Sequence, residues 1–564
     1  MLGGLPDQTD MKGILLLLSL IGFFLALKWF RKDLHPSFYP AVTVSGISVM
    51  TCLGGIIGLL GETVNILFFL GLFSFFLFGT LYFRKVFRNK WQSETTSFLW
   101  MLCSFLGLCI CSAFLLQNRF LYAYDDFSHW GLVSNILLKQ SRLPTISDGL
   151  MFPSYPLGSA SFICFCCRVI GNSSGACLLA QNVMLISFLL SLQSISSKRW
   201  AGILLATAAI PMFQFYNTPI DSLSVDNLLG AAFLSAMLLF LWENENHINI
   251  LPDLMVILSA CVMIKNSGLF LAIGIILLFL IRWISIRQKT SPALICLFVP
   301  FLIYLAWRIH LKTCFSDFGK HYMSLYVYYG TFRRKITELG LIFQVILPVI
   351  ASPIKNHALL MIPAFALVYW NTLPEIRKEQ KRIILICCVL FVFYEAGILV
   401  MYICSMGTGE LIAQNGGDFP RYNGTIICAL AGILMKLIAR SMNHNAPAQT
   451  AKRSISLMAA ASILVACMSM KITPLKSLDQ CRKENPDASA FSTMTKGRSF
   501  TEGQEIAVLF HEEEPSDYEA YMAYYYLYPV KNIKLFGSRS RVPELGNGIS
   551  LIDLRQIEGA DSMR

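Results

Sequence analysis

The stretch SFLWMLCSFLGLCICSAFLLQNRFLYAYDDFSHW, residues 97–130, joins a long apolar run to a cluster of polar side chains. Residues 97–117 carry no charge. A helix of that length crosses the hydrocarbon core of a bilayer, which is about 30 Å thick. Two adjacent carboxylates, Asp125 and Asp126, follow closely, and His129 comes shortly after them. The stretch therefore predicts a transmembrane helix that delivers an acidic pair and an imidazole to one membrane face.

Similar apolar runs recur along most of the chain. The 564 residues are 55% hydrophobic and only 14% charged, with a mean hydropathy of +0.58. This composition predicts an all-α polytopic protein that is embedded in a lipid bilayer. The net charge of +12 comes from short basic clusters between apolar runs, such as KWFRK (28–32) and RKVFRNK (84–90). Clusters in such places orient helices, so no nucleic-acid partner is expected.

Apolar runs and basic clusters together predict how the helices are oriented. The first spans lie near 12–30, 38–60, 63–83 and 97–117. With these spans, the basic clusters at 28–32 and 84–90 lie in the cytoplasm and the acidic pair lies outside. Further clusters that should be cytoplasmic lie at 196–200, 281–289, 375–382 and 436–453.

This orientation requires that two short apolar stretches, 157–171 and 339–353, do not cross the membrane. Both are near or below the roughly 17 residues that a span needs, so we expect interfacial or re-entrant helices there. About 14 transmembrane helices result.

With this orientation, the unusual polar residues of the chain gather on the outer face. They are Asp125, Asp126, His129, the turn MFPSYPLGS (151–159), Asp221, Asp226, Lys265, the loop at 318–335, and Arg421 within GGDFPRYNG (416–424). We therefore expect the functional site on the extracytoplasmic side of the cell membrane.

An acidic pair beside the end of a span is often only a solvated loop. Here Tyr124 and Trp130 flank the pair, and FSHWGLVSNILLKQ (127–140) has the apolar spacing of a helix that lies in the membrane interface. On such a helix either carboxylate can share a face with His129. That arrangement suits a divalent cation, or a general base with a neighbour that tunes it.

Two cations and a third acid on the same side each have a structural and a functional interpretation. Lys265 interrupts the apolar stretch 250–284, and it either snorkels outward or forms a phosphate site with the start of the next helix. Arg421 precedes a span and is either an interface anchor or a second phosphate-binding cation. Asp226 either caps the helix that follows it or belongs to the site.

Several short motifs carry a resemblance to a known family. In chain order they are YDDFSHW (124–130), FPSYPLGS (152–159), SVDNLLG (224–230), MIKNSGLFLA (263–272) and DFPRYN (418–423). Their order and shared sidedness resemble the bacterial members of the GT-C superfamily of membrane glycosyltransferases. Two features depart from that family: its usual YPPG is YPLG here, at 155–158, and the spans before residue 97 are not part of the shared core.

The resemblance implies a polyprenyl-phosphate sugar donor, an acceptor that is a cell-surface glycan, lipid or protein, and often a divalent metal such as Mg²⁺ or Mn²⁺. It makes Asp125 or Asp126 the catalytic base or a metal ligand, with Asp125 preferred as the base. Asp126 and His129 are the expected metal ligands, and Lys265 and Arg421 would hold the donor phosphate. Further residues assigned to donor or substrate binding are Tyr422, Asp226, Tyr155 and Trp130.

The residue inventory independently favours lipid-linked chemistry. The sequence has neither a GxxxxGK[ST] loop nor a GxGxxG fingerprint after a strand, so no nucleotide cofactor is expected. A hexosyl- or pentosyltransferase on the outer face must then take its sugar from a lipid. Transfer to a hydroxyl needs a carboxylate to accept the proton and cations to stabilise the departing phosphate. Attack from the face opposite the phosphate would invert the anomeric centre.

The resemblance, which begins at about residue 97, and a change of composition after about residue 472 divide the chain into three parts. We expect additional N-terminal transmembrane helices at 1–96, a membrane catalytic core at 97–471, and a small extracytoplasmic α/β domain at 472–564. Within the last part, the pattern predicts a strand, a helix and two strands at 505–510, 516–529, 532–537 and 548–554. Such a module would cap the outer-face site, and its tyrosines either pack internally or stack against a sugar.

Two other functions use the same kind of substrate. A transporter or flippase for a lipid-linked sugar would place ionisable groups at the bilayer midplane and often shows internal repeats. The one clear mid-span acid is Glu395, and no repeat is visible. A polysaccharide polymerase or ligase on the outer face is the second alternative.

Overall fold

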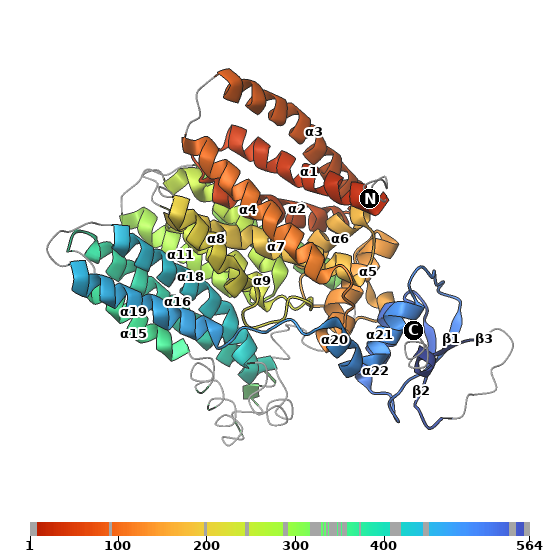
Figure 1. Ribbon diagram of the computed structural model, residues 1–564. Coiled ribbons are helices and arrows are strands. Elements are labelled where there is room, and N and C mark those ends of the chain that lie inside the picture. Colours follow the sequence, from red (N-terminus) through yellow and green to blue (C-terminus); the bar gives the residue numbers. More distant parts are fainter. Residues whose placement is uncertain are drawn as a thin grey trace.

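Helices dominate the computed structural model, and a small sheet lies at its periphery (Figure 1). The predicted fold class, an all-α membrane protein with a small C-terminal α/β part, is confirmed. Eight of the described helices are long and apolar enough to cross a membrane, and the total number of spans stays a prediction. The structure describes residues 8–88, 93–196, 200–242, 247–285, 292–315, 358–371, 374–405, 419–443, 450–540 and 549–557, with isolated residues between 329 and 351.

Each of the first four predicted spans forms one helix, because each is a continuous apolar run bounded by polar residues. They are α1 (Gln8–Phe30), α2 (Tyr39–Ile56), α3 (Leu60–Arg88) and α4 (Ser93–Leu116). α1 and α3 pack side by side (Figure 1), and a Cβ on Gly71 of α3 would lie only 2.6 Å from the Ser19 carbonyl. A glycine at this contact lets the two backbones approach closely, as is common between membrane helices.

The other long helices of the membrane part are α5 (Gly131–Gln140), α6 (Gly158–Ile170), α7 (Ser174–Leu189), α8 (Trp200–Gln214), α9 (Asp226–Phe240), α10 (Leu251–Ile264), α11 (Gly268–Ser285), α12 (Val299–Cys314), α15 (Met361–Trp370), α16 (Pro374–Ser405), α18 (Phe419–Asn443) and α19 (Thr450–Ser469). The stretch 157–171, expected not to cross, forms α6, and its 13 residues extend about 20 Å. That length is below the hydrocarbon thickness of about 30 Å. Almost all of the second stretch, 339–353, lies outside the described residues.

The bundle has α9 at its centre, and all 15 residues of this helix are buried. A Cβ on Gly230 of α9 would lie 2.9 Å from the backbone of α18. A Cβ on Gly432 of α18 would lie 2.5 Å from the Leu234 side chain of α9. Residue numbers rise together along this contact, so the two helices run parallel and begin at the same end. Asp226 at the start of α9 and Arg421 in the first turn of α18 are therefore neighbours.

The C-terminal part contains α20 (Leu478–Glu484), α21 (Pro486–Met494), β1 (Glu505–Leu509), α22 (Asp517–Leu527), β2 (Asn532–Phe536) and β3 (Ile549–Asp553). The predicted strand, helix, strand, strand order is confirmed. The sheet has the order β2-β1-β3 and is parallel throughout. Parallel neighbours need a crossover, and α22 supplies it between β1 and β2. Helices α20, α21 and α22 lie between the strands and the membrane helices (Figure 1).

Candidate active site

The acidic pair lies at the start of a wide helical turn. Asp126 to Trp130 form a single π-helical turn that continues into α5, and all five of these residues are buried. Such turns are rare and occur often at functional sites. The helix predicted at 127–140 is thus present, and its position in the membrane interface stays a prediction. Residues 131–137 are also buried. The reason is that α22 of the C-terminal part covers this turn.

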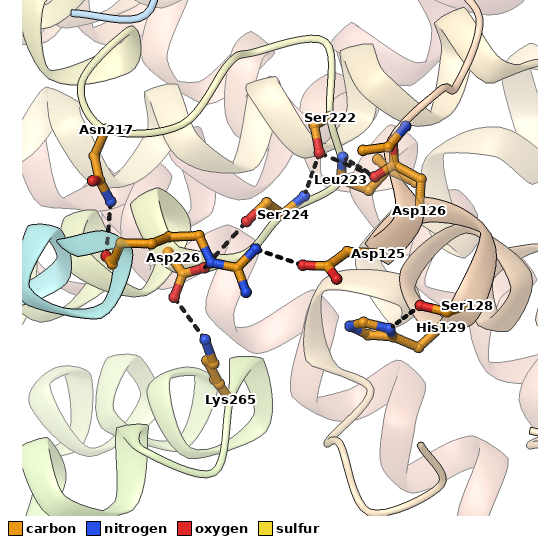
Figure 2. A network of polar contacts seen from close by, with 12 residues as sticks. Asp125, Asp126, Ser128, His129, Asn217, Ser222, Leu223, Ser224, Asp226 and Lys265 are labelled. Carbon is orange, nitrogen blue, oxygen red and sulfur yellow. Dashed lines mark hydrogen bonds and ion pairs between the residues drawn. The ribbon is translucent and has the colours of Figure 1, made fainter. Parts of the chain in front are cut away.

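The two carboxylates of the pair point in different directions (Figure 2). Oδ1 of Asp126 accepts hydrogen bonds from the Leu223 N–H at 2.7 Å and from the Ser222 hydroxyl at 3.1 Å. Its Oδ2 accepts one from the Ala123 N–H at 3.3 Å. Asp126 therefore ties the turn to the 222–224 loop, which leads into α9.

A pH dependence of stability follows from the surroundings of Asp126. Burial raises the pKa of Asp126 to about 7, and the charge of Asp125 also raises it, while the hydrogen bonds to Asp126 act in the opposite direction. A carboxyl with a raised folded pKa stabilises the protein at low pH, and this contribution is lost as the pH rises from the ordinary value toward 7.

We expect the unfolding temperature of the protein in detergent to fall between about pH 4 and about pH 7. The Asp126→Asn variant has no titrating group at this position and should lose most of that slope. The exposed carboxylate Asp517 provides the control variant, Asp517→Asn, which should keep it. Equal slopes in the wild type and Asp126→Asn would contradict this assignment.

A chain of alternating charges runs from Lys265 to Asp125 (Figure 2). Lys265 Nζ lies 2.6 Å from Asp226 Oδ1, and Arg421 Nε lies 3.2 Å from Asp226 Oδ2. The same guanidinium places Nη1 2.6 Å from Asp125 Oδ2. Residues from four distant segments thus form one ion-pair network, which has two positive and two negative groups.

The ion-pair network is buried at one end and open at the other. The side chains of Asp226 and Lys265 are 3% and 11% exposed, whereas those of Arg421 and Asp125 are 27% and 24% exposed. Burial acts to raise the pKa of Asp125, but the charges of Arg421 and His129 outweigh burial and hold that pKa below its usual range. Asp125 is therefore an ionised carboxylate at neutral pH, at the end that a substrate can reach.

Two residues that the sequence analysis did not assign support the network. The Ser224 hydroxyl donates to Asp226 Oδ2 at 3.2 Å, and the Asn217 amide donates to the Arg421 carbonyl at 2.9 Å. Asn217 has a φ of 68°, which Asn adopts more readily than most other residues. The sequence signal that could have identified this position is an Asn at the start of a polar turn, NTPIDS (217–222).

An aromatic cluster borders the network. The rings of His129 and Tyr155 stack with centroids 5.0 Å apart and an interplanar angle of 13°, and Trp130 lies 5.2 Å from Tyr155. The turn that carries Tyr155 is fixed to the break after α10, because the Asn266 amide donates to the Ser154 carbonyl at 3.2 Å. Trp130 and Tyr155, both assigned to substrate binding from the sequence, thus belong to this cluster and not to the ion-pair network.

The predicted site residues come together in part. Asp125, Asp226, Lys265 and Arg421 share the ion-pair network, and Tyr422 adjoins it with its ring centroid 4.2 Å from Lys265 Nζ. Lys265 does not snorkel outward, since it is buried against Asp226. Asp226 bonds its side chain to the network residues and to a serine rather than capping α9. Residues 416–418 and most of the loop at 318–335 lie outside the described residues.

The donors around the acidic pair do not form a metal cage. Within the described ranges, no group of three or more His, Cys, Asp or Glu side chains is placed to hold a metal ion. Both oxygens of Asp126 accept hydrogen bonds, Asp125 pairs with Arg421, and Nδ1 of His129 lies 2.8 Å from the Ser128 hydroxyl. The side chains of Asp126 and His129 thus have protein partners, and their predicted role as a pair of metal ligands stays a prediction.

No family model matches the chain, and no curated protein matches its sequence. Among solved structures, the crystal structure of ArnT from Cupriavidus metallidurans bound to undecaprenyl phosphate is similar, with a TM-score of 0.45 and 12% sequence identity. The superposition covers 77% of this chain and 86% of that chain.

Proposed function

We propose that the protein is a membrane glycosyltransferase. It moves a hexosyl or pentosyl group from a polyprenyl-phosphate-linked donor to a hydroxyl of a cell-surface glycan, lipid or protein on the extracytoplasmic face. The observation that carries this proposal is the ion-pair network, in which Arg421 is shared by Asp125 and Asp226. The network brings an ionised carboxylate and two cations together at one end of a bundle of apolar helices.

The buried part of the network suits a phosphate group. Asp226 holds Lys265 and Arg421 on its two oxygens, so these three side chains together keep one positive charge. A positive charge in a partly buried place attracts an anion more strongly than it would in water. The guanidinium of Arg421 can also bind two phosphate oxygens at once. Asp226 is in this scheme a positioning residue, because it fixes the spacing of the two cations.

Donor binding changes the partner of Arg421. When the guanidinium of Arg421 binds the phosphate, Asp125 loses its closest positive neighbour. The pKa of Asp125 then rises, and Asp125 becomes a stronger base. Asp125 then accepts the proton of the acceptor hydroxyl while the acceptor oxygen bonds to the anomeric carbon. The bond between that carbon and the phosphate oxygen breaks, and its electron pair stays on the phosphate.

The leaving group is polyprenyl phosphate, and Arg421 with Lys265 stabilises the charge that grows on it. Attack from the face opposite the phosphate inverts the anomeric centre, and NMR of the product tests this. Among the described residues no three metal-ligating side chains converge, so no step is assigned to a divalent ion here. A chelation experiment tests the metal separately: loss of transfer that Mg²⁺ or Mn²⁺ restores would add a metal to this scheme.

Binding of undecaprenyl phosphate tests the role of Arg421. The change Arg421→Gln removes charge-assisted hydrogen bonds, and we expect binding to weaken by about 10- to 100-fold. Arg421→Lys keeps the charge without the planar fork and should give an intermediate affinity. Arg482→Gln, at an exposed position on α20, is the matched control and should leave affinity unchanged. Equal binding by Arg421→Gln and the wild type would contradict the proposed donor site.

Reconstitution in vesicles with a panel of polyprenyl-phosphate sugars distinguishes the alternatives. Release of polyprenyl phosphate together with a new glycosidic product supports sugar transfer. Movement of the intact donor across the bilayer, with no product, would instead support a transporter. Growth of one lipid-linked glycan at the expense of another would support a polymerase or ligase.

A further inference from the structure

Helix α22 of the C-terminal part packs directly behind the turn that carries the acidic pair. Three of its tyrosines, Tyr518, Tyr525 and Tyr526, share one face of the helix and surround the ring of Phe127, with centroids 5.7, 5.5 and 5.8 Å away. Phe127 is fully buried there and lies two residues from Asp125. The turn therefore has an aromatic anchor in a part of the chain about 400 residues away in sequence.

Hydrogen bonds fasten the segment just before the pair to the same helix. The Tyr518 hydroxyl donates to the Tyr122 carbonyl at 2.7 Å, and the Tyr526 hydroxyl donates to the Leu121 carbonyl at 3.5 Å. The Tyr122 hydroxyl in turn donates to Asp221 Oδ1 at 3.0 Å. Residues 121 and 122 belong to no helix or strand, so their carbonyls take partners from the C-terminal part.

The turn itself leaves no room for a side chain at Gly131, and α22 packs tightly beside it. A Cβ on Gly131 would lie 2.5 Å from the Asp126 carbonyl and 3.3 Å from the Tyr525 ring. On the next turn of α5, the Asn135 amide donates to the Tyr525 carbonyl at 2.9 Å. α22 thus contacts the segment before the turn, the turn itself and the first part of α5.

These contacts leave Asp125 between two supports. Its side chain reaches across the site to Arg421 on α18, while the backbone beside it is held from behind by α22. On the loop side, Asp126 ties the same turn to residues 222–224. A displacement of about 1 Å in a reacting group can lower a rate by about 10²-fold, so the rear support affects chemistry.

We propose that α22 is a positioning element of the active site, which sets the place of Asp125 relative to Arg421 by holding Phe127 and the Tyr122 carbonyl. The inference rests on the proposed function for the role of Asp125. It gives the C-terminal part a task beyond covering the site, and it assigns the tyrosines around Phe127 to support of the turn instead of sugar stacking.

Two tyrosines of α22 provide a matched pair of variants. Tyr518→Phe removes the hydroxyl that bonds the Tyr122 carbonyl and keeps the ring against Phe127. Tyr524→Phe removes a hydroxyl that bonds the Asp148 carbonyl at 2.8 Å, away from the turn. Both tyrosines are half-buried on the same helix. The two changes therefore have the same chemistry and differ in which loop they release.

The first readout is hydrogen exchange of the full-length protein in detergent. Loss of one hydrogen bond should raise the exchange of amides at 122–130 by about two- to tenfold in Tyr518→Phe. Tyr524→Phe should leave the exchange of these amides unchanged. Unchanged exchange at 122–130 in Tyr518→Phe, or an equal increase in both variants, would overturn the proposal.

The second readout is kinetic. Tyr518→Phe should lower kcat by a similar factor, while KM for the donor and binding of undecaprenyl phosphate stay at wild-type values. The reason is that Lys265, in the break after α10, and Arg421, on α18, belong to other elements. A rise in donor KM with unchanged kcat would overturn a positioning role for α22. Hydrogen exchange needs no activity, so it still decides whether α22 holds the turn if the protein transfers no sugar and the proposed function fails.

Discussion

Replacement of Asp125 by Asn is expected to lower the rate of sugar transfer by about 10²- to 10⁴-fold, the range that general base catalysis contributes. The amide is almost the same size and keeps an oxygen that can face Arg421, but it cannot take up the acceptor proton. At the same time Arg421 loses a carboxylate that lies 2.6 Å from it and competes with the donor phosphate. Undecaprenyl phosphate should therefore bind Asp125→Asn as well as the wild type, or more tightly.

These opposite effects on turnover and on binding separate a lost base from a damaged site. Transfer is measured as product released from a polyprenyl-phosphate sugar, and binding is measured with undecaprenyl phosphate alone. The Asp517→Asn control changes an exposed carboxylate of α22 and should alter neither quantity. Wild-type transfer by Asp125→Asn would remove Asp125 from the mechanism, and weakened binding would show that the change disturbs the donor site itself.

Much of the fold could be predicted because its signals are local. A continuous apolar run such as 97–117 indicates a span without reference to any other part of the chain, and α4 forms over it. The C-terminal strands and helix were also predictable, since short apolar runs alternate with turn residues there. The partner of the helix at 127–140 could not be predicted, because α22, which covers that turn, lies almost 400 residues away in the sequence. The apolar spacing of a helix shows that one face is covered but does not show what covers it.

The site was predictable in its members but not in its connections. Charged residues near apolar helices attract attention singly, so Asp226, Lys265 and Arg421 could each be identified. Their pairing could not, because the contact depends on α9 and α18 starting side by side. Adjacent aspartates also look alike in a sequence. The structure separates them, since Asp126 bonds the 222–224 loop while Asp125 faces Arg421.

Replacement of Asp226, the acid that pairs with both Lys265 and Arg421, is expected to lower the stability of the protein strongly. Asp226→Asn leaves Lys265 buried at 9% exposure without its carboxylate partner, and it leaves Arg421 close to that ammonium. Removing one partner of a buried ion pair costs about 3–5 kcal/mol, so the variant should unfold at a much lower temperature. Thermal or denaturant unfolding in detergent measures this loss, with Asp517→Asn as the exposed control.

The double variant Asp226→Leu with Lys265→Met separates stability from function. Apolar side chains of similar size can replace a buried ion pair with little loss or even a gain in stability, so unfolding should return near the wild-type value. Binding of undecaprenyl phosphate should be weaker than in the wild type, because one of the two phosphate-binding cations is missing and Arg421 has lost the carboxylate 3.2 Å from its Nε. A double variant that stays as unstable as Asp226→Asn would mean that Asp226 stabilises the fold mainly through Arg421. A stable double variant with normal donor binding would show that Lys265 is a structural partner only.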